Sequence, residues 1–453
     1  MNLKDKRFLV AGIGKSGIAA AELLKKQRMD VRLYDGNTNL DTEALVQQYP
    51  FLEDTEVILG VLPKKEMQKT DILVLSPGIS TDLPMVTAMR DMGIAVWGEI
   101  ELAYAFAKGY LLAVTGTNGK TTTTTLLGEI LKSYYSDVKV VGNIGIPYTS
   151  VALDTTEGTV TAAEISSFQL ETVHKFAPKV TAILNITPDH LNRHHTMENY
   201  IAIKESITKN QTKEDLCVLN YEDRMLRDFG KKLKTKVIWF SSARELKDGF
   251  YLKDNCIYYA KEGYATEFIK TEELKLLGKH NYENVMAASA MAFGFGIPVS
   301  VIQRVLKEFT AVEHRIEYVA EKKGVKFYND SKATNPDAAI QGVLAMDRPT
   351  YLIGGGSNKD SVYDKWIGAF GDKVKELVLI GQTKEKIAKA AEEQGFLSVT
   401  MAESLEEAVN ICYAHARFGD AVLLSPACAS YGMFQNYEER GRIFKEIVRS
   451  LKE

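Results

Sequence analysis

A glycine- and threonine-rich segment, Gly116-Thr-Asn-Gly-Lys-Thr-Thr122, has the residue types that hold phosphate groups. It lies between an apolar run at residues 111–115 and a helical pattern of leucines. In such a turn the backbone N–H groups cradle phosphate oxygens, the lysine reaches the outer phosphates and the next hydroxyl ligates Mg²⁺. The spacing is unusual, because Val114 stands where a general P-loop has its first glycine. The pattern favours ATP binding over a plain turn with a solvated lysine, and the expected contacts are Gly116, Thr117, Asn118, Gly119, Lys120, Thr121 and Thr122.

A second glycine turn, near the N-terminus, has the spacing Gly12-x-Gly14-x-x-Gly17. It follows an apolar run at residues 7–11, and Asp35 ends the next apolar run. This arrangement fits the dinucleotide fingerprint, in which glycines let the backbone approach a diphosphate at a helix N-terminus. Three interpretations stay open on these residues alone: NAD(P) binding, binding of another nucleotide diphosphate such as a UDP-sugar, or a tight turn that needs glycine for packing.

A third group of residues combines a carboxylate with histidines. Glu164 stands in an apolar and hydroxyl-bearing stretch, where an unpaired carboxylate would be costly, so it needs a salt-bridge partner or a metal ion. His190 follows another apolar run, at residues 181–185, and His194 and His195 come shortly after it. Zinc would need a tetrahedral set of His or Cys ligands, and no cysteine lies close in the sequence, so zinc is disfavoured.

These segments require an α/β scaffold to position them. Short β-rich runs alternate with helical stretches, which predicts parallel sheets covered by helices. The length of 453 residues suggests roughly three domains. From the pattern we place the boundaries near residues 97 and 311, which divides the chain into a domain at 1–97 with the first glycine turn, a central ATP-binding domain at 98–311 and a C-terminal domain at 312–453.

Composition excludes several classes of protein. Apolar residues make up 45% of the chain and charged residues 25%, which is an ordinary globular balance. The net charge of −3 leaves no basic footprint for a nucleic acid. The charged start differs from a signal peptide, and no stretch approaches the ~18 apolar residues of a membrane span. The scattered cysteines, with no C-x-x-C pair, are typical of reduced thiols. We therefore expect a cytoplasmic protein with neither a nucleic-acid nor a membrane partner.

The phosphate-binding turn is the first of a series of short motifs that occur in order along the chain. The others are Gly142-Asn-Ile-Gly145, Glu164-Ile-Ser-Ser-Phe-Gln169, Asn185-Ile-Thr-Pro-Asp-His190, His280-Asn-Tyr-Glu-Asn284, His314-Arg315, Asn329-Asp-Ser-Lys-Ala-Thr-Asn335 and Leu424-Ser-Pro-Ala-Cys-Ala-Ser430. Each motif is short, but together and in this order they closely resemble the Mur ligase family.

The resemblance implies a three-domain α/β fold, with a Rossmann-like N-terminal domain, a P-loop ATPase-like central domain and a Rossmann-like C-terminal domain. It implies an ATP-dependent ligase that phosphorylates a carboxylate and joins it to an amino acid, with a UDP-muramoyl substrate, and not NAD(P), on the first domain. The motifs are most similar to the branch that acts, as a monomer, on UDP-N-acetylmuramoyl-L-alanine, D-glutamate and ATP in peptidoglycan precursor synthesis. Other branches of the family, a folylpolyglutamate synthetase-like ligase and a non-catalytic nucleotide sensor are the alternatives.

The resemblance also implies roles that the pattern leaves open. Asn281 would contact the adenine of ATP, Asp330 the ribose and Arg315 the phosphates; the alternative for Asn281 is a helix cap. Two Mg²⁺ ions are implied, and their expected ligands are Thr121, Glu164, His190 and Lys204. Lys204 would bind as a carbamate, because a lysine beside Mg²⁺ is driven to the neutral amine, which reacts with CO₂. The implied catalytic residues are Lys120, Glu164, His190, Lys204 and Arg315, whereas His194 and His195 match nothing functional and are expected at the surface.

Substrate contacts follow from the same resemblance. Those for the UDP-substrate are Gly14, Lys15, Ser16, Asp35, Gly78 and Asn143. Those for D-glutamate are Lys332, Thr334, Lys359, Ser430 and Tyr437, so the resemblance implies that residues 312–453 form an amino-acid-binding domain. The D-glutamate residues lie on loops after apolar runs, and loops at the C-terminal ends of parallel strands converge in space. Lysines and hydroxyl groups suit a dicarboxylate, with solvated loop lysines as the alternative. The chain departs from the family pattern at Tyr437, where phenylalanine is common, and at Tyr431-Gly-Met433, which lacks a frequent acidic residue.

Overall fold

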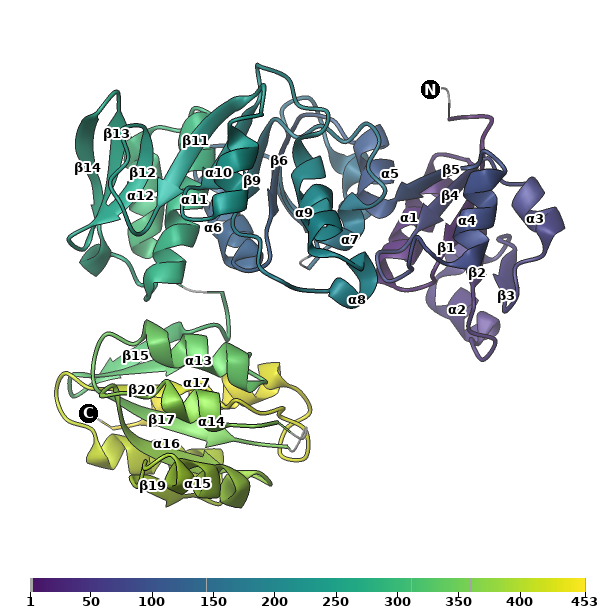
Figure 1. Ribbon diagram of the computed structural model, residues 1–453. Helices are drawn as coiled ribbons and strands as arrows, with labels where there is room; N and C mark the ends of the chain where they lie inside the picture. The colour runs from purple at the N-terminus through teal and green to yellow at the C-terminus, as the bar shows by residue number, and fades with distance from the viewer. Residues whose placement is uncertain (1–2, 144, 311, 358–360, 453) are drawn as a thin grey trace. The chain divides into compact units, whose positions relative to one another are not determined.

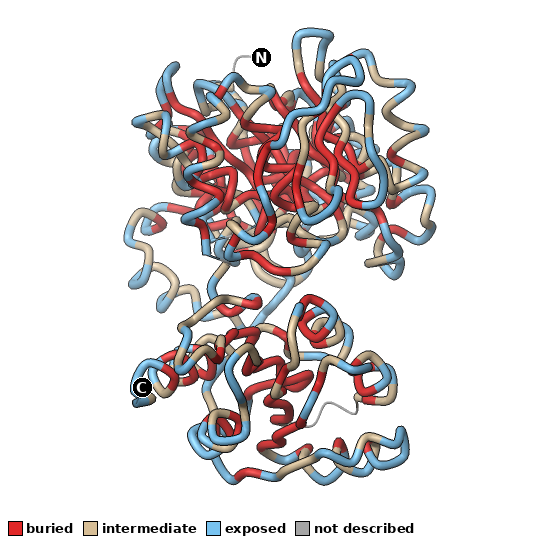
Figure 2. The backbone as a smooth tube through the Cα atoms, turned by 90° about the vertical axis from the view of Figure 1, so that its left-hand side faces the viewer, coloured by how far each residue is buried: buried red, intermediate tan, exposed pale blue. Residues whose placement is uncertain are grey.

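The computed structural model describes residues 3–143, 145–310, 312–357 and 361–452 (Figure 1). The chain forms two compact units. The first takes in most of the chain up to Lys253 together with Tyr258–Glu267 and Asn284–Gln303. The second takes in Asp254–Ile257, Phe268–Glu283 and the chain from Arg304 onward. Buried backbone runs through the middle of each unit, with exposed segments outside it (Figure 2). Among the described residues, no helix has the length and apolar character to cross a bilayer.

The N-terminal part of the first unit is a parallel sheet with the strand order β3-β2-β1-β4-β5. Its strands are β1 (Arg7–Ala11), β2 (Asp30–Asp35), β3 (Val57–Leu59), β4 (Ile72–Leu75) and β5 (Ala95–Gly98). Its helices are α1 (Lys15–Lys26), α2 (Thr42–Gln48), α3 (Lys64–Gln68), α4 (Pro84–Asp91) and α5 (Glu99–Phe106), with a 3₁₀ turn η1 (Pro50–Leu52). The strand order reverses between β1 and β4, which is where open α/β sheets bind ligands at the carboxyl ends of their strands.

The first glycine turn connects β1 directly to α1. Gly12 has φ of +89°, a backbone conformation that favours glycine. A Cβ atom at Gly17 would lie 1.8 Å from the carbonyl oxygen of Gly12, so this position also requires glycine. The helix begins at Lys15, directly after Gly14. Lys15 and Ser16 therefore lie in its first turn.

The central part is a nine-stranded sheet with the order β14-β13-β12-β11-β10-β9-β6-β8-β7. Pairing is parallel from β7 through to β12. The strands are β6 (Tyr110–Thr115), β7 (Val138–Gly142), β8 (Val160–Glu164), β9 (Val180–Ile183), β10 (Leu216–Asn220), β11 (Lys236–Ser241), β12 (Gly249–Lys253), β13 (Cys256–Lys261) and β14 (Tyr264–Lys270). The helices are α6 (Lys120–Lys132), α7 (Ser167–Leu170), α8 (Leu191–His194), α9 (Met197–Glu205), α10 (Arg224–Gly230), α11 (Lys279–Gly294) and α12 (Val299–Glu308). Four 3₁₀ turns complete this part: η2 (Tyr148–Ser150), η3 (Ala152–Asp154), η4 (Ser206–Thr208) and η5 (Thr271–Glu273).

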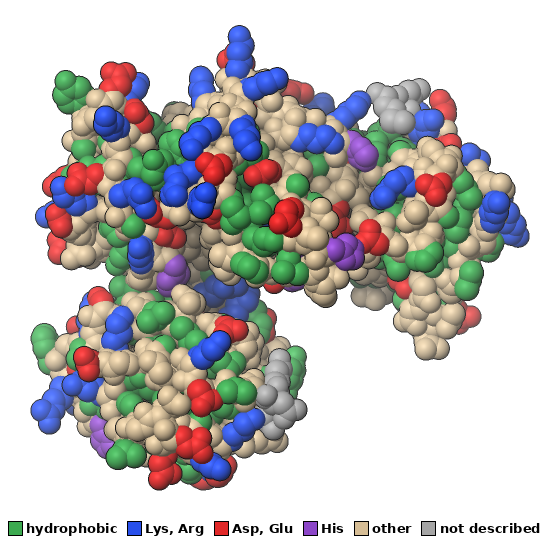
Figure 3. All heavy atoms as spheres, in the orientation of Figure 1, with side chains coloured by type: hydrophobic (Ala, Val, Ile, Leu, Met, Phe, Trp, Pro, Cys, Tyr) green, Lys and Arg blue, Asp and Glu red, His purple; other side chains and the backbone are tan. Residues whose placement is uncertain are grey.

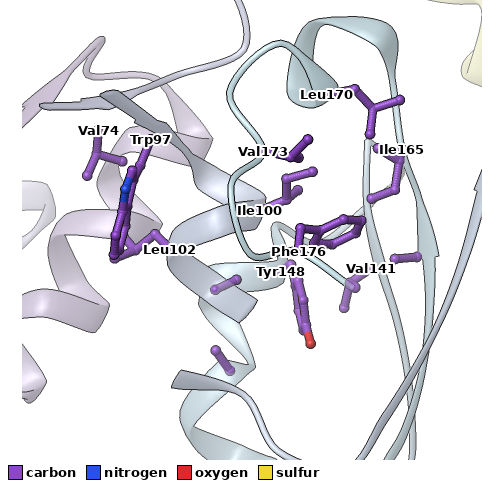
Figure 4. Close-up of a cluster of buried hydrophobic side chains, with 14 of the residues drawn as sticks. Val74, Trp97, Ile100, Leu102, Val141, Tyr148, Ile165, Leu170, Val173 and Phe176 are labelled. Atoms are coloured by element: carbon purple, nitrogen blue, oxygen red, sulfur yellow. The ribbon is translucent and has the colours of Figure 1, made fainter. Parts of the chain in front are cut away.

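One hydrophobic core is shared by the N-terminal and central sheets. Figure 4 shows part of it, with side chains from the first sheet and α5 beside side chains from the central domain: Val74, Trp97, Ile100, Leu102, Val141, Tyr148, Ile165, Leu170, Val173 and Phe176. Helix α5 also carries two buried carboxylates across this junction. Glu99 accepts hydrogen bonds from the backbone and side chain of Thr149, at 2.7 and 3.0 Å. Glu101 accepts from three consecutive backbone N–H groups at residues 174–176. The junction is therefore both apolar and specifically hydrogen-bonded.

The C-terminal sheet has the order β15-β16-β20-β17-β18-β19; β15 pairs antiparallel with β16, and the other strand pairs of the described residues are parallel. Its strands are β15 (Glu317–Lys322), β16 (Val325–Asn329), β17 (Thr350–Gly355), β18 (Val374–Ile380), β19 (Val399–Met401) and β20 (Ala421–Leu424). Its helices are α13 (Pro336–Ala345), α14 (Asp364–Gly368), α15 (Lys384–Glu393), α16 (Leu405–His415) and α17 (Tyr437–Ser450). Apolar residues of α13–α15 pack on one face of the sheet, and those of α16 and α17 pack on the other. The predicted three-domain α/β architecture is confirmed. The boundary near 97 falls within β5, residue 311 lies outside the described residues, and the exact limits stay a prediction.

Candidate active site

The phosphate-binding turn connects the carboxyl end of β6 to the N-terminus of α6. Gly119 precedes the helix with φ of +84°, and a Cβ atom there would lie 2.2 Å from Oδ1 of Asn284, so only glycine fits. Several hydrogen bonds anchor the turn to the segment after β9, two of them from backbone N–H groups of the turn. Thr117 N donates to the carbonyl oxygen of Asn185 at 2.9 Å, and Asn118 N donates to its Oδ1 at 2.8 Å. The first N–H groups of α6 therefore face the turn in the arrangement that binds phosphate.

Two lysines converge on one carbonyl oxygen of this turn. Lys120 Nζ donates to Gly116 O at 2.9 Å and to Thr117 O at 2.8 Å. Lys204 Nζ, which reaches the turn from α9, donates to the same Gly116 oxygen at 2.8 Å. Lys204 is 1% exposed, and burial together with the charge of Lys120 lowers its pKa to about 7. The structure therefore brings together two of the lysines that the sequence singled out, and one of them is an amine that loses its proton near neutral pH.

Tyr200 belongs to this group although the sequence did not single it out. Its hydroxyl lies 3.1 Å from Oγ1 of Thr117, and Lys204 Nζ lies 4.7 Å from the centre of its ring. The signal in the sequence was the spacing of four residues between Tyr200 and Lys204, which puts both on one face of a helix.

Glu164 ends β8 and has one oxygen in need of a partner. Its Oε1 accepts a hydrogen bond from Asn143 Nδ2 at 2.8 Å. Its Oε2 is buried and has no hydrogen-bond partner among the described residues. A buried carboxylate oxygen in this state suits a hard cation such as Mg²⁺. Within the described ranges, no three His, Cys, Asp or Glu side chains form a metal-binding group. A cation at Glu164 would therefore need ligands beyond such side chains, for example hydroxyl groups, substrate oxygens or a modified lysine.

His190 lies at the surface beside an aromatic ring. Its backbone has φ of +52°, and its imidazole is 4.8 Å from the ring of Phe168, centre to centre. The prediction that His194 is a surface residue is wrong. His194 is 2% exposed, contacts Ser167 Oγ at 3.0 Å and lies 3.4 Å from a carboxylate oxygen of Glu171. The single turn of α8 directs it inward, and burial lowers its pKa. His195 is exposed, as predicted, and pairs with Asp82 at 2.8 Å.

The residues predicted to hold the UDP-substrate lie at the carboxyl edge of the first sheet and beside it. Asp35 Oδ2 accepts a hydrogen bond from Ile13 N at 3.0 Å, so Asp35 orders the glycine turn. Lys15 Nζ donates to the carbonyl oxygen of Gly145, which lies two residues after Asn143. No heavy atom lies within 4 Å of a Cβ built at Gly14 or Gly78, so both backbones border open space. Lys15 therefore links the glycine turn to the loop that bears Asn143.

The residues predicted to bind D-glutamate lie in the second unit, on loops after β16 and β20 and at the start of α17. Lys332 Nζ lies 5.5 Å from the ring centre of Tyr437. The fully buried Arg440 holds the loops together, since it donates to Ser331 Oγ at 2.9 Å, to Ser331 O at 2.8 Å and to Cys428 O at 3.1 Å. Thr334 and Ser430 lie on these same loops. Lys359 lies outside the described residues.

The remaining predicted ATP contacts also lie in the second unit. Asp330 accepts hydrogen bonds from Ser425 Oγ at 2.7 Å and from Ile316 N at 3.3 Å, and burial raises its pKa to about 7. The charge of Arg315 counteracts that rise. Asn281 is the third residue of α11, and its Nδ2 donates to Leu277 O at 2.7 Å. It is therefore not the helix cap that the sequence left as an alternative.

Comparison with protein families matches three consecutive parts of the chain. Residues 6–98 match the Mur ligase MurD-like N-terminal domain, residues 114–292 the Mur ligase middle domain, and residues 314–428 the Mur ligase, glutamate ligase domain. Two relatives are named UDP-N-acetylmuramoylalanine–D-glutamate ligase. The one from Lachnoclostridium phytofermentans is 53% identical over 453 residues, and the one from Lachnospira eligens is 54% identical over 451 residues; each match covers 100% of both chains.

Solved structures share the fold at lower identity. The UDP-N-acetylmuramate-alanine ligase of Thermotoga maritima has a TM-score of 0.59 and 18% identity, and the match covers 99% of this chain and 100% of that one. The MurF ligase of Thermotoga maritima in complex with ADP has a TM-score of 0.54 and 16% identity, with 99% of each chain covered.

Proposed function

The chain belongs to the Mur ligase family, and we propose that it joins D-glutamate to the alanyl carboxylate of UDP-N-acetylmuramoyl-L-alanine in an ATP-dependent step of peptidoglycan precursor synthesis. The observation that carries this proposal is full-length identity of 53–54% to relatives named for that reaction. The pair of lysines on the Gly116 carbonyl oxygen supports it, because it brings the ammonium of Lys120 and the buried amine of Lys204 to one phosphate-binding turn.

The reaction begins with activation of the carboxylate, which is a poor electrophile. An oxygen of the alanyl carboxylate attacks the γ-phosphorus of ATP, the bond to the bridging oxygen breaks, and ADP leaves with that electron pair. The products of this step are an acyl phosphate and ADP. Lys120 lies at the start of α6, where its ammonium and the helix N–H groups offset the charge of the transferring phosphoryl group. In our proposal Arg315 supplies a second cation there, Asn281 contacts the adenine and Asp330 contacts the ribose.

Magnesium fits the residues at the end of β8. The buried, unpartnered Oε2 of Glu164 supplies an anionic ligand, and we propose that Thr121, His190 and carbamylated Lys204 complete the protein's ligands for two Mg²⁺ ions. When bound, Mg²⁺ would neutralise negative charge on the phosphate oxygens. Asn143, which donates to the other oxygen of Glu164, keeps that carboxylate oriented.

The second step forms the amide bond. The neutral amine of D-glutamate attacks the acyl carbon of the acyl phosphate to give a tetrahedral intermediate. Collapse of this intermediate expels phosphate, and the amine loses its proton, which yields the amide. We propose that Lys332, Thr334, Lys359, Ser430 and Tyr437 hold the D-glutamate, with the lysines facing its carboxylates. Arg440 keeps the two described loops that carry these residues in place through Ser331 and Cys428.

The UDP moiety is assigned to the first domain. We propose that the turn at Gly14, Lys15 and Ser16 binds it, with Asp35, Gly78 and Asn143 as further contacts. The N-terminus of α1 supports this assignment, because Gly14 leaves its first N–H groups without a side-chain cap.

On the face shown in Figure 3, Lys and Arg side chains are interspersed with Asp and Glu. We also propose that the protein acts as a monomer in the cytoplasm and has neither a nucleic-acid nor a membrane partner.

The test is ADP release from the full-length protein with ATP, Mg²⁺, UDP-N-acetylmuramoyl-L-alanine and each candidate amino acid in turn. We expect release that requires the UDP-substrate and D-glutamate together. A different preferred amino acid would favour another branch of the family. ATP binding without ADP release for any amino acid would favour a nucleotide sensor and refute the proposed function.

A further inference from the structure

The side chain of Arg193 connects the segment after His190 to the loop after β4. Its Nε and Nη2 donate to the two carboxylate oxygens of Glu171, at 2.9 and 2.7 Å. Its Nη1 donates to Pro77 O at 2.9 Å, and its Nη2 also donates to Ile79 O at 2.8 Å. Four of the five guanidinium N–H groups are thus used, and the side chain is only 12% exposed.

The guanidinium also stacks on an aromatic ring that leads to His190. The carbon Cζ of Arg193 lies 4.1 Å from the ring centre of Phe168. The imidazole of His190 lies 4.8 Å from the same ring centre. Phe168 belongs to α7, four residues after Glu164. Arg193 and Phe168 therefore form an unbroken series of contacts from the loop after β4 to a residue that we place at the reacting end of the site.

The two ends of this series correspond to the two ends of the substrate. Pro77 and Ile79 flank Gly78, which we assign to the UDP-substrate, whereas His190 is assigned to the metal. The UDP moiety and the alanyl carboxylate lie at opposite ends of one molecule. The separation between the loop after β4 and His190 must therefore match the length of the substrate for the carboxylate to reach the γ-phosphate of ATP.

We propose that Arg193 is a positioning residue that sets this separation and thereby governs productive binding of the UDP-substrate. The inference rests on the proposed function and adds to it a residue that takes no part in the chemistry. Only arginine has a planar fork that can bind a carboxylate, two carbonyl oxygens and an aromatic face at once. Lysine at this position keeps the positive charge beside Glu171, which is 7% exposed, but loses that geometry.

Arg193→Lys is therefore the informative variant, and Arg244→Lys is its control. Arg244 also forms a bidentate pair, with Glu222 at 3.0 and 2.8 Å, and both residues lie in the central domain. A double variant, Arg193→Gln with Glu171→Gln, removes both charges together and leaves no unpaired buried carboxylate. If Arg193→Lys does not fold, the double variant still tests the proposal.

The experiment combines ADP-release kinetics, in which each substrate is varied in turn, with calorimetric binding of UDP-N-acetylmuramoyl-L-alanine and a thermal melt. For Arg193→Lys and for the double variant we expect KM and Kd for the UDP-substrate to rise at least about tenfold. The reason is that the hydrogen bonds from the Arg193 guanidinium to Pro77 O and Ile79 O, which fix the separation between the two ends of the substrate site, are lost. We expect KM for ATP and for D-glutamate to stay unchanged. Arg244→Lys should match the wild-type protein for all three substrates.

An unchanged Kd for the UDP-substrate in the folded variants would overturn the proposal. An equal loss of affinity for all three substrates, or a lower melting temperature alone, would also overturn it, because either result indicates a purely structural arginine. A wild-type protein that binds the UDP-substrate but releases no ADP would refute the proposed function, and the Kd values would then decide the role of Arg193. A wild-type protein that neither binds nor turns over the UDP-substrate would refute both.

Discussion

The surroundings of Lys204 favour carbamylation of its side chain. Nζ of Lys204 is buried beside Lys120, and its pKa is lowered from 10.5 to about 7. At about pH 7.5 this leaves about three quarters of the amine neutral, whereas the ordinary pKa would leave about one in a thousand neutral. Only the neutral amine attacks CO₂, so the structure raises the reactive fraction by several hundredfold. The product is an anion, which changes the interaction with Lys120 from repulsion to attraction.

The sign of the pH dependence follows from the same pKa. The folded-state pKa is depressed, so the neutral fraction is high above about pH 7 and falls as the pH falls through that value. We expect removal of CO₂ to lower ADP release, added bicarbonate to restore it, and the bicarbonate requirement to grow below about pH 7. With an ordinary lysine the neutral fraction would be negligible over this whole range.

The assay pairs ADP release with ¹³C NMR after incubation with ¹³C-labelled bicarbonate. The wild-type protein should show a carbamate carbonyl signal that is absent in Lys204→Arg, and Lys204→Arg should be nearly inactive because a guanidinium does not form the carbamate. Lys209→Arg is the control, because Lys209 is an exposed lysine shortly after the same helix, and it should keep both the signal and the activity. Full activity in Lys204→Arg, or the same ¹³C spectrum for it and the wild type, would refute the reasoning.

Three further outcomes are expected. Lys120→Ala should abolish ADP release while circular dichroism stays native, because the phosphates lose their nearest cation; near-normal turnover would contradict the ATP site. Titration should show saturable binding of UDP-N-acetylmuramoyl-L-alanine and none of NADH, and tight NADH binding would instead revive the dinucleotide interpretation of the Gly12–Gly17 turn. Ser430→Ala and Lys359→Ala should each raise KM for D-glutamate roughly ten- to a hundredfold through loss of a hydrogen bond to a charged group. Equal effects on the KM for ATP would rule out that role.

Local features of the sequence determined much of the fold. The apolar runs at residues 7–11 and 111–115 form β1 and all but the first residue of β6, because each is a short apolar run that leads into a glycine turn. The turn at Gly119 was also predictable, since it follows an apolar strand, opens a helix and needs a positive φ. The strand expected at 181–185 ends at Ile183 instead, because Asn185 turns away to bind the phosphate loop.

The tertiary structure alone decided which distant residues meet. Nothing local in the sequence relates Arg193 to Pro77, 116 positions away, or Lys204 to Gly116, 88 positions away. The burial of His194, which we expected at the surface, also depends on residues distant in the sequence, because its ring contacts Ser167 and Glu171. Periodicity reports which side of an element is apolar, but it does not report which other element covers that side. The low pKa of Lys204 arises only when α9 packs over the turn that holds Lys120, because burial and a neighbouring charge are properties of the assembled fold.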